Sequence, residues 1–451
     1  MKRRIFLIII TIMSLSALLT ACSDVASGAV KDITASEADG KAAIVNDSST
    51  VTGSSTKVTD AGSTYNSETG NDKVTQSNPD DVSDLFSKRD LNQTPDLSEA
   101  ETIKVQDGQT YTITEEGIYI ITGTASDCTI RVEADKEAKV QLVLDGVDIT
   151  NEDFPAIYVV SADKCFITTT DSENSLAVTD KFISDGETKT DAVIFSKDDL
   201  VLNGIGTLNI SSAYANGISG KDDIKITGGT YNIRSTKDSI EANDSISVYD
   251  GILNITSGKD GLHSENDDDD TLGWIRIIGG TFNIIATSDA IQATTYAQID
   301  GGTFEIDARE GIEATYIQIN GGEININASD DGLNASLKSK VYSVPVIEFY
   351  GGTTTIVMGQ GDTDAVDANG NIYVNGGTID VTATVSSFDY DGTAEFNGGT
   401  IIINGSEVDS IPQSMMGGPG GFGGNGNFGG NGNFGGNGNT ENNGWGGKGR
   451  R

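Results

Sequence analysis

Between about Ile103 and Ser410 the chain alternates apolar and polar residues at period two, and Gly-Gly doublets interrupt this alternation. Doublets at residues 279, 301 and 321 give spacings of 22 and 20 residues. Alternation at period two is typical of β-strands, and no window keeps the period of 3.6 residues that a helix needs. A fixed period of this length indicates a solenoid, because one repeat buries its apolar face only by stacking on a neighbour. The sequence therefore predicts an all-β fold, a right-handed parallel β-helix of eleven or twelve coils with three short strands in each.

The strand after each doublet carries an apolar face and a polar face. We expect its apolar side chains to stack inside the coils as ladders, namely Tyr231, Ile233, Leu253, Ile255, Phe282, Ile284, Phe304, Ile306, Ile324 and Ile326. An aromatic column can be a platform for sugars, but this one has the phase of the core. The opposite face repeats Thr and Asn, among them Asn232, Asn254 and Asn283, and is predicted to form solvated hydrogen-bonding ladders.

The strand before each doublet has a more varied outward face, in which Tyr occurs beside Gln, Lys and Arg. Such a composition is typical of sugar-binding surfaces, because the C–H faces of a sugar pack on aromatic rings while its hydroxyl groups bond to polar side chains. The candidate carbohydrate-binding residues are Tyr249, Arg276, Tyr350 and Tyr373. The alternative is that these are scattered surface residues without a shared function.

A third element repeats an acidic residue, a small residue, Ile or Leu, any residue, and Ala or Ser. Its acidic positions are Asp238, Asp260, Asp289, Glu310, Asp331 and Asp364. Carboxylates on adjacent coils lie about 5 Å apart. At an effective dielectric constant of 20, each unscreened pair costs roughly 3 kcal/mol.

Calcium would offset this repulsion, because it takes several oxygen ligands at about 2.4 Å. The candidate calcium ligands are Asp238, Glu241, Asp260, Asp289, Glu313, Asp331, Asp364 and Asp367. The alternative is that the Asp residues form turns by bonding to their own backbone, and that Lys237 and Lys259 screen their charge. The pattern does not show which carboxylates converge, because the alternation breaks at turns.

Charge and cysteine content narrow the class of protein. The chain has 451 residues, a formal net charge of −38 and one histidine. So acidic a surface argues against binding nucleic acid or anionic lipid, and it suits a protein that binds divalent cations.

Cys128 and Cys165 are too few for a disulfide framework, and two buried thiols are favoured over a disulfide bond between them.

The N-terminal residues predict export and a lipid anchor. Lys2, Arg3 and Arg4 precede an apolar run that ends in Leu-Thr-Ala-Cys22, so residues 1–21 are expected to be a signal peptide. The sequence before Cys22 resembles a bacterial lipobox, which makes Cys22 the expected lipidation site. The alternative is ordinary cleavage, with Cys22 as a chance thiol. The predicted protein is thus extracytoplasmic and cell-surface, touching the membrane through its lipid alone.

Composition divides the rest of the mature chain into three parts. Residues 22–98 are rich in Ser, Thr and Asp and are predicted to be a disordered tether, residues 99–410 the β-helix, and residues 411–451 a flexible tail rich in Gly and Asn. The sequence leaves the oligomeric state open.

Several motifs resemble a bacterial surface β-helix family of carbohydrate-binding domain-containing proteins. They include LVLDGVDIT (142–150), PAIYV (155–159), AVIFSKDDLVLNGIGTLNI (192–210) and NGISGKDDIKITGGTYNI (216–233), together with the acidic repeats. The resemblance implies a right-handed parallel β-helix, structural calcium, binding of cellulose and polygalacturonate, and similarity in fold to calcium-dependent pectate lyases. Asn216 and Glu310 depart from the repeated Asp and put individual metal sites in question.

Three functions remain open. The favoured one is non-catalytic binding of plant cell-wall polysaccharide at the cell surface. The second is a calcium-dependent polysaccharide lyase whose base is Lys237, Lys259 or Arg309. A lyase base needs a depressed pKa, whereas an acidic surface raises the pKa of a Lys. The third is a structural adhesin or spacer.

Overall fold

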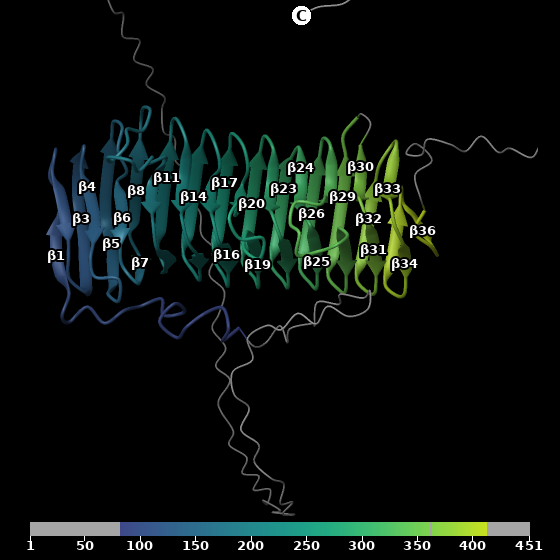
Figure 1. The fold of residues 1–451 in the computed structure, drawn as a ribbon, viewed down its shortest axis with the longest axis horizontal. Coiled ribbons are helices and arrows are strands. Elements are labelled where there is room, and N and C mark those ends of the chain that lie inside the picture. The colour runs from purple at the N-terminus through teal and green to yellow at the C-terminus, as the bar shows by residue number, and fades with distance from the viewer. Residues whose placement is uncertain (1–81, 361–362, 413–451) are drawn as a thin grey trace, which may run out of the picture. The chain divides into compact units, whose positions relative to one another are not determined.

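The computed structural model describes residues 82–360 and 363–412, which form a stack of β-coils (Figure 1). Every element in this part is a strand, from β1 to β36, and all but one of the strand pairs between named strands are parallel. The predicted parallel β-helix is therefore confirmed. No helix in the described ranges is long and apolar enough to span a membrane. Cys22, the signal peptide, residues 22–81 of the tether and the tail from residue 413 lie outside the described residues.

Each coil contributes one strand to each of three sheets. The first sheet contains β1 (Glu101–Lys104), β3 (Gly117–Ser126), β5 (Lys139–Asn151), β7 (Lys164–Thr169), β10 (Asp199–Gly204), β13 (Ile224–Ile226), β16 (Ser245–Val248), β19 (Trp274–Ile277), β22 (Tyr296–Ile299), β25 (Tyr316–Ile319), β28 (Val346–Phe349), β31 (Asn371–Val374) and β34 (Ala394–Phe396). The long strands β3 and β5 continue round the corner into the second sheet.

The second sheet follows the first along the chain. Beyond β3 and β5 it contains β8 (Glu173–Val178), β11 (Thr207–Ser212), β14 (Thr230–Ser235), β17 (Ile252–Ser257), β20 (Thr281–Ala286), β23 (Thr303–Ala308), β26 (Glu323–Ala328), β29 (Thr353–Met358), β32 (Thr378–Thr382) and β35 (Thr400–Ile403). At its end the antiparallel strand β36 (Ser406–Val408) pairs with β35.

The third sheet closes each coil. It contains β2 (Thr110–Ile113), β4 (Thr129–Glu133), β6 (Ile157–Ser161), β9 (Ala192–Ser196), β12 (Asn216–Gly220), β15 (Ile240–Ala242), β18 (Leu262–Ser264), β21 (Asp289–Ala293), β24 (Glu310–Ala314), β27 (Asp331–Ala335), β30 (Asp364–Ala368) and β33 (Ser386–Tyr390). These twelve strands define twelve coils in the described part, within the predicted range.

The Gly-Gly doublets form the corner between the first and second sheets. Gly302 has φ of +103°, a backbone conformation that side chains rarely adopt, and a Cβ there would lie 3.0 Å from the carbonyl oxygen of Gly280. The corner glycines of adjacent coils thus stack closely, which explains why the doublet recurs.

The apolar ladders predicted for the second sheet are buried. Phe282 and Phe304 stack with ring centroids 4.5 Å apart and an angle of 4° between their planes. Tyr231 is 1% exposed. These aromatic rings are core residues and are not available to sugars. Cys128 and Cys165 are both buried and free, as favoured from the sequence.

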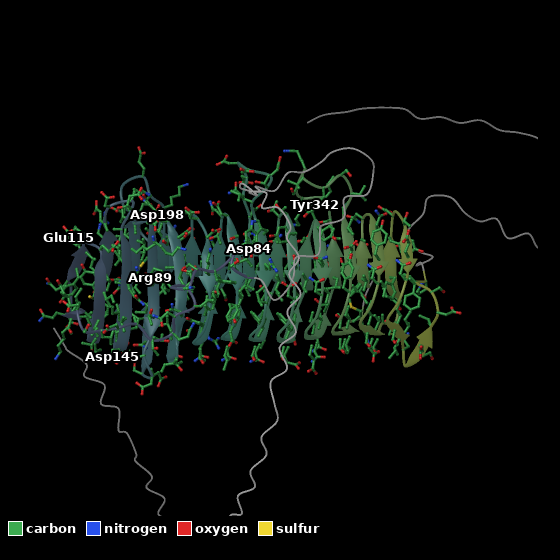
Figure 2. All side chains as sticks on the ribbon, turned by 90° about the horizontal axis from the view of Figure 1, so that it is seen from below. Asp84, Arg89, Glu115, Asp145, Asp198 and Tyr342 are labelled. Atoms are coloured by element: carbon green, nitrogen blue, oxygen red, sulfur yellow. The ribbon has the colours of Figure 1, made fainter. Side chains whose placement is uncertain are left out.

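The segment before β1 lies across the outward face of the first sheet. Lys225 Nζ donates to the Leu85 carbonyl oxygen at 2.7 Å, and the Phe86 ring is buried and in edge contact with Tyr249. Asp84 and Arg89 of this segment are labelled in Figure 2. Arg89 lies over the Phe166 ring of β7, 4.6 Å from its centroid.

Buried polar contacts fix the same segment to β10 and to the corner after β13. The Asp90 carbonyl oxygen accepts hydrogen bonds from Thr227 Oγ1 and Asn203 Nδ2, and Gln93 Oε1 accepts one from the backbone N–H of Gly204. The prediction of a disordered tether is therefore wrong for residues 82–98. Its composition is that of a linker, but its few apolar and amide side chains find partners on strands more than 100 residues away.

Candidate functional site

The acidic repeat forms two parallel columns on the third sheet. The strand register aligns the first column as Asn216, Asp238, Asp260, Asp289, Glu310, Asp331 and Asp364, and the second as Ser219, Glu241, His263, Gln292, Glu313, Asn334 and Asp367. Members of the second column follow those of the first by three residues. The chain turns at the first column, so that side chains of both columns meet on the outside of the sheet.

Carboxylates of the first column also link adjacent coils. Asp238 Oδ1 accepts from the backbone N–H of Asp260 at 3.0 Å, and Asp260 Oδ1 accepts from that of Asp289 at 3.1 Å. Asn216 Oδ1 accepts in the same way from Asp238. These bonds run to the next coil and not to the residue's own turn, so they differ from the turn-forming role that was the alternative to calcium, and an Asn makes the same bond without a charge. This hydrogen bond uses one oxygen of the carboxylate and leaves the other oxygen available to a cation.

Four groups of side chains bring three possible ligand atoms within 4.8 Å of one another in the described residues. They are Asp238, Glu241 and His263; Asp289, Glu310 and Glu313; Glu310, Asp330 and Asp331; and Asp199, Asp222 and Asp223. The structure therefore brings together five of the eight predicted calcium ligands in three of these groups. Asp260, Asp364 and Asp367 are in the columns but in none of the groups.

The calcium ligands predicted from the sequence omit His263, Glu310 and Asp330, and also the whole group of Asp199, Asp222 and Asp223. Glu310 is one of the acidic positions of the repeat but not one of the predicted calcium ligands, and its register places it between Asp289 and Asp331. The longer Glu side chain contributes to two groups at once. Counting residues from Asp289 and Asp331 gives Glu310 its place in the column, and this signal was available in the sequence.

From Asp289 onward the acids of the columns outnumber the cations beside them, which are Arg309, paired with Asp289 and Glu310, and Lys338, paired with Glu313. Burial first, and then the Glu310 and Asp260 carboxylates, raise the pKa of Asp289 to about 7. Burial together with Asp367 and Asp330 raises the pKa of Asp331 to about 8, and burial together with Asp364 and Asp389 raises that of Asp367 to about 7. Without a bound cation, these acids hold protons near neutral pH.

The coil of His263 is balanced by its own cations. His263 Nδ1 lies 3.5 Å from Asp238 Oδ2, and its Nε2 lies 3.4 Å from Glu265 Oε2. Burial alone lowers the pKa of His263, but the contacts with Asp238 and Glu265 outweigh it and raise the pKa to about 9. Lys259 Nζ is 2.9 Å from Asp260 Oδ2.

Two of the three candidate lyase bases are held in ion pairs. Burial lowers the pKa of Lys259, but Asp260 and Asp238 outweigh burial and raise it. Arg309 bonds to Glu310 at 2.5 Å and to Asp330 at 2.6 Å, and its pKa is also raised. Lys237 is exposed and pairs with no acid within the described residues. Neither Lys259 nor Arg309 has the depressed pKa that a base needs.

The four candidate carbohydrate-binding residues do not form one open surface. Tyr249 is 38% exposed and its ring edge meets Phe86. Arg276 is 4% exposed and bonds to Asp300 at 2.9 Å, so the expectation of an exposed guanidinium is wrong. Tyr350 and Tyr373 are half-buried, and Tyr350 donates to Glu348 at 3.0 Å.

Further aromatic rings on the first sheet were missed from the sequence. The Trp274 and Tyr296 rings stack with centroids 5.3 Å apart, and the Tyr316 and Tyr342 rings stack at 5.0 Å. In each pair the two rings cover one face of each other, so these rings hold adjacent coils and an inserted loop together.

Fold and site together define a solenoid that displays stacked polar side chains along its faces. The family model of the carbohydrate-binding domain-containing protein matches residues 107–365 and 313–410, more than half of the chain. The chain belongs to this family and carries a carbohydrate-binding domain with a parallel β-helix fold.

Two known proteins show the extent of the likeness. A carbohydrate-binding domain-containing protein of Acetivibrio thermocellus is 38% identical over 127 residues, which is 27% of this chain and 44% of that relative. The chain thus spans less than half the length of this relative. A solved structure, the polysaccharide lyase-like protein from C. thermocellum in a gadolinium derivative, aligns at 29% identity with a TM-score of 0.43, over 52% of this chain and 96% of that chain.

Proposed function

We propose that this protein is a lipid-anchored cell-surface protein that binds plant cell-wall polysaccharide without cleaving it, and that calcium on the third sheet bridges it to polygalacturonate. Cellulose is the second polysaccharide we assign to it. The observation that carries the proposal is the convergence of Asp289, Glu310 and Glu313, three carboxylates that are each less than 10% exposed and whose ligand atoms lie within 4.8 Å.

The donor set of these coils fits calcium. Calcium takes six to eight oxygen ligands from carboxylates and amide or backbone carbonyls. Asp289, Glu310 and Glu313 would hold one ion, and Asp330, Asp331 and Glu310 a second. Asn334 donates its Nδ2 to Glu310 at 3.0 Å, while its buried Oδ1 has no hydrogen-bond partner and is a further neutral oxygen beside the same carboxylate.

Charge explains why the ion has to take part in binding. The chain carries a net charge of −38 and polygalacturonate is a polyanion, so direct contact is repulsive. A calcium ion shared between protein and uronate carboxylates reverses the sign of the local field. Asp330 and Asp331 are half-buried, whereas Asp289, Glu310 and Glu313 are buried. An ion held by Asp330 and Asp331 is therefore more accessible to a ligand than an ion held by the buried group.

Cleavage is not part of the proposal, because two of the three candidate bases, Lys259 and Arg309, are engaged by acids. The third, Lys237, is exposed outside both carboxylate groups proposed to hold calcium. Anchoring through Cys22 and an extracytoplasmic address follow from the lipobox-like sequence at residues 19–22.

Retention on polygalacturonate tests the proposal. We expect the full mature chain to be retained in calcium and released by chelator, and we expect Asp331→Asn to weaken retention about tenfold, the loss of one ligand contact of roughly 1.4 kcal/mol. Asp148→Asn, an exposed acid on β5, is the matched control. Retention that ignores chelator would contradict calcium bridging. Absorbance from unsaturated products would contradict binding without cleavage.

A further inference from the structure

A shallow groove of ≈ 630 Å³ lies on the outward face of the second sheet, where residues of β14, β17, β20 and β23 line it. These four strands lie side by side in Figure 1. It is separate from the acidic columns, which belong to the third sheet. The groove crosses coils whose inward residues are the Tyr231, Phe282 and Phe304 ladder, so a rigid core supports its floor.

A ladder of asparagine amides runs along this groove. Asn283 Nδ2 donates to Asn254 Oδ1 at 2.8 Å, Asn254 donates to Asn232 at 2.8 Å, and Asn232 donates to Asn209 at 2.7 Å. Asn209 in turn donates to the Glu173 carboxylate at 3.0 Å. Because a carboxylate only accepts, this end fixes the direction of every amide in the ladder.

The ladder leaves hydrogen-bonding capacity facing the groove. A primary amide has two N–H donors and two acceptor lone pairs, and Asn232 and Asn254 each use one donor and one lone pair within the ladder. Each keeps a donor beside an acceptor, repeated at about 4.8 Å from strand to strand. Hydroxyl groups, which also donate and accept, match this arrangement.

The ladder breaks between Asn283 and Glu305, which are register partners on β20 and β23. Asn283 Oδ1 and the Glu305 carboxylate are both acceptors, and Glu305 receives its one side-chain hydrogen bond in the described residues from Asn325. Two adjacent acceptors call for a ligand that donates, as a hydroxyl group does and a uronate carboxylate does not.

Charge and apolar surface in the groove agree with a neutral ligand. Arg234 is exposed in the groove, but Glu305 and Asp307 also line it, so the lining carries more acids than bases and does not attract an anion. Ile285 is 57% exposed at the centre of this face and offers the apolar contact that the C–H face of a sugar needs.

We propose that this groove binds a neutral, hydroxyl-rich polysaccharide chain, with the free amide edges of the asparagine ladder and Glu305 bonding to hydroxyl groups and Ile285 packing on a sugar face. The proposal rests on the proposed function in taking carbohydrate as the ligand. It does not depend on calcium or on the tyrosines of the first sheet.

Titration of the full mature protein with cellohexaose in chelator tests this site. Ile285→Ala and Glu305→Gln should each weaken binding about fivefold or more, since the first removes apolar contact and the second replaces an acceptor by a group that can close the ladder onto Asn283. Val357→Ala and Glu323→Gln are matched controls, because both residues are exposed on the same sheet outside the groove.

Each result has a defined meaning when polygalacturonate retention in calcium is measured beside it. Loss of cellohexaose binding in the two groove variants alone, with polygalacturonate retention unchanged, supports the proposal. Equal binding by all variants, or no cellohexaose binding by the unmodified protein, overturns it, while the polygalacturonate arm still reports on the calcium bridge. If Ile285→Ala loses binding to both cellohexaose and polygalacturonate, the assignment of the groove to a neutral chain is overturned.

Discussion

The coil of His263 and the coils from Asp289 onward carry the same acidic repeat with opposite electrostatic outcomes. Asp238 has its pKa lowered, because His263 outweighs the effect of burial, whereas burial and neighbouring acids raise the pKa of Asp331 to about 8. In the first case two cations of the chain, His263 and Lys259, balance the carboxylates. In the second, Arg309 and Lys338 pair with Asp289, Glu310 and Glu313, but no cation of the described residues pairs with Asp331, so a cation from solution would have to balance it.

This difference shows that a repeated motif does not imply a repeated site. Whether a column member is a metal ligand or a partner in an ion pair depends on the residue at the second-column position one coil further on. For Asp238 that residue is His263, for Asp260 it is Gln292, and for Asp289 it is Glu313.

Removing the internal cation should have the largest effect. We expect His263→Gln to lower the free energy of unfolding by about 3 kcal/mol at pH 7, because it leaves Asp238 and Asp260 buried beside one lysine only. The measurement is urea unfolding in chelator. As the pKa of His263 is about 9, the gap to the unmodified protein should close as the pH rises through 9. A gap that does not change with pH would indicate lost packing instead.

Calcium should stabilise the coils from Asp289 onward. An ion that binds the folded state alone at a concentration 100 times its Kd adds about 2.7 kcal/mol per site. We expect the melting temperature to rise on adding calcium and to fall back with chelator. An unchanged melting temperature would contradict calcium binding in these coils.

Stability in chelator should depend on pH in the direction set by the raised pKa values. Asp289, Asp331 and Asp367 have pKa values of about 7, 8 and 7 when folded and ordinary values near 4 when unfolded, so the folded state binds more protons between these limits. Stability is therefore expected to fall as the pH rises from 4 to 8. Calcium should abolish most of this fall, and a rise with pH in chelator would refute the raised pKa values.

The smallest effect is expected for removing one charge from an unbalanced coil. Glu310→Gln should raise the free energy of unfolding in chelator by about 1 kcal/mol, because it relieves repulsion with Asp289 and Asp331. The same change should reduce the gain from calcium. Glu323→Gln, at an exposed acid on the second sheet, is the control for loss of charge alone. Destabilisation of Glu310→Gln in chelator would show that its bonds to Arg309 and Asn334 matter more than the repulsion.

Much of the site was predictable from the sequence, and the failures have physical causes. The columns follow from the repeat length, which places Asp260 and Asp289 one coil apart. The repeat length does not show which carboxylates of the columns converge. Asp289 and Glu313 belong to different coils, and their side chains come together because the chain turns at the first column. Arg276 was expected to be exposed because its strand position points outward, but residues 82–98 and Asp300 cover it.

The sequence by itself determined the β-helix, the number of coils, the inward ladders and the lines on which acids and amides stack. Those depend on local alternation and on a repeat length, and both can be counted along the chain. Only the tertiary structure decided which carboxylates share a centre, which of them His263 and Lys259 neutralise, and which outward face the segment before β1 covers. Those outcomes depend on contacts between residues as far as more than 100 positions apart in the sequence. The distance between two such side chains is set by their length and by the path of the chain, and the repeat length does not predict it.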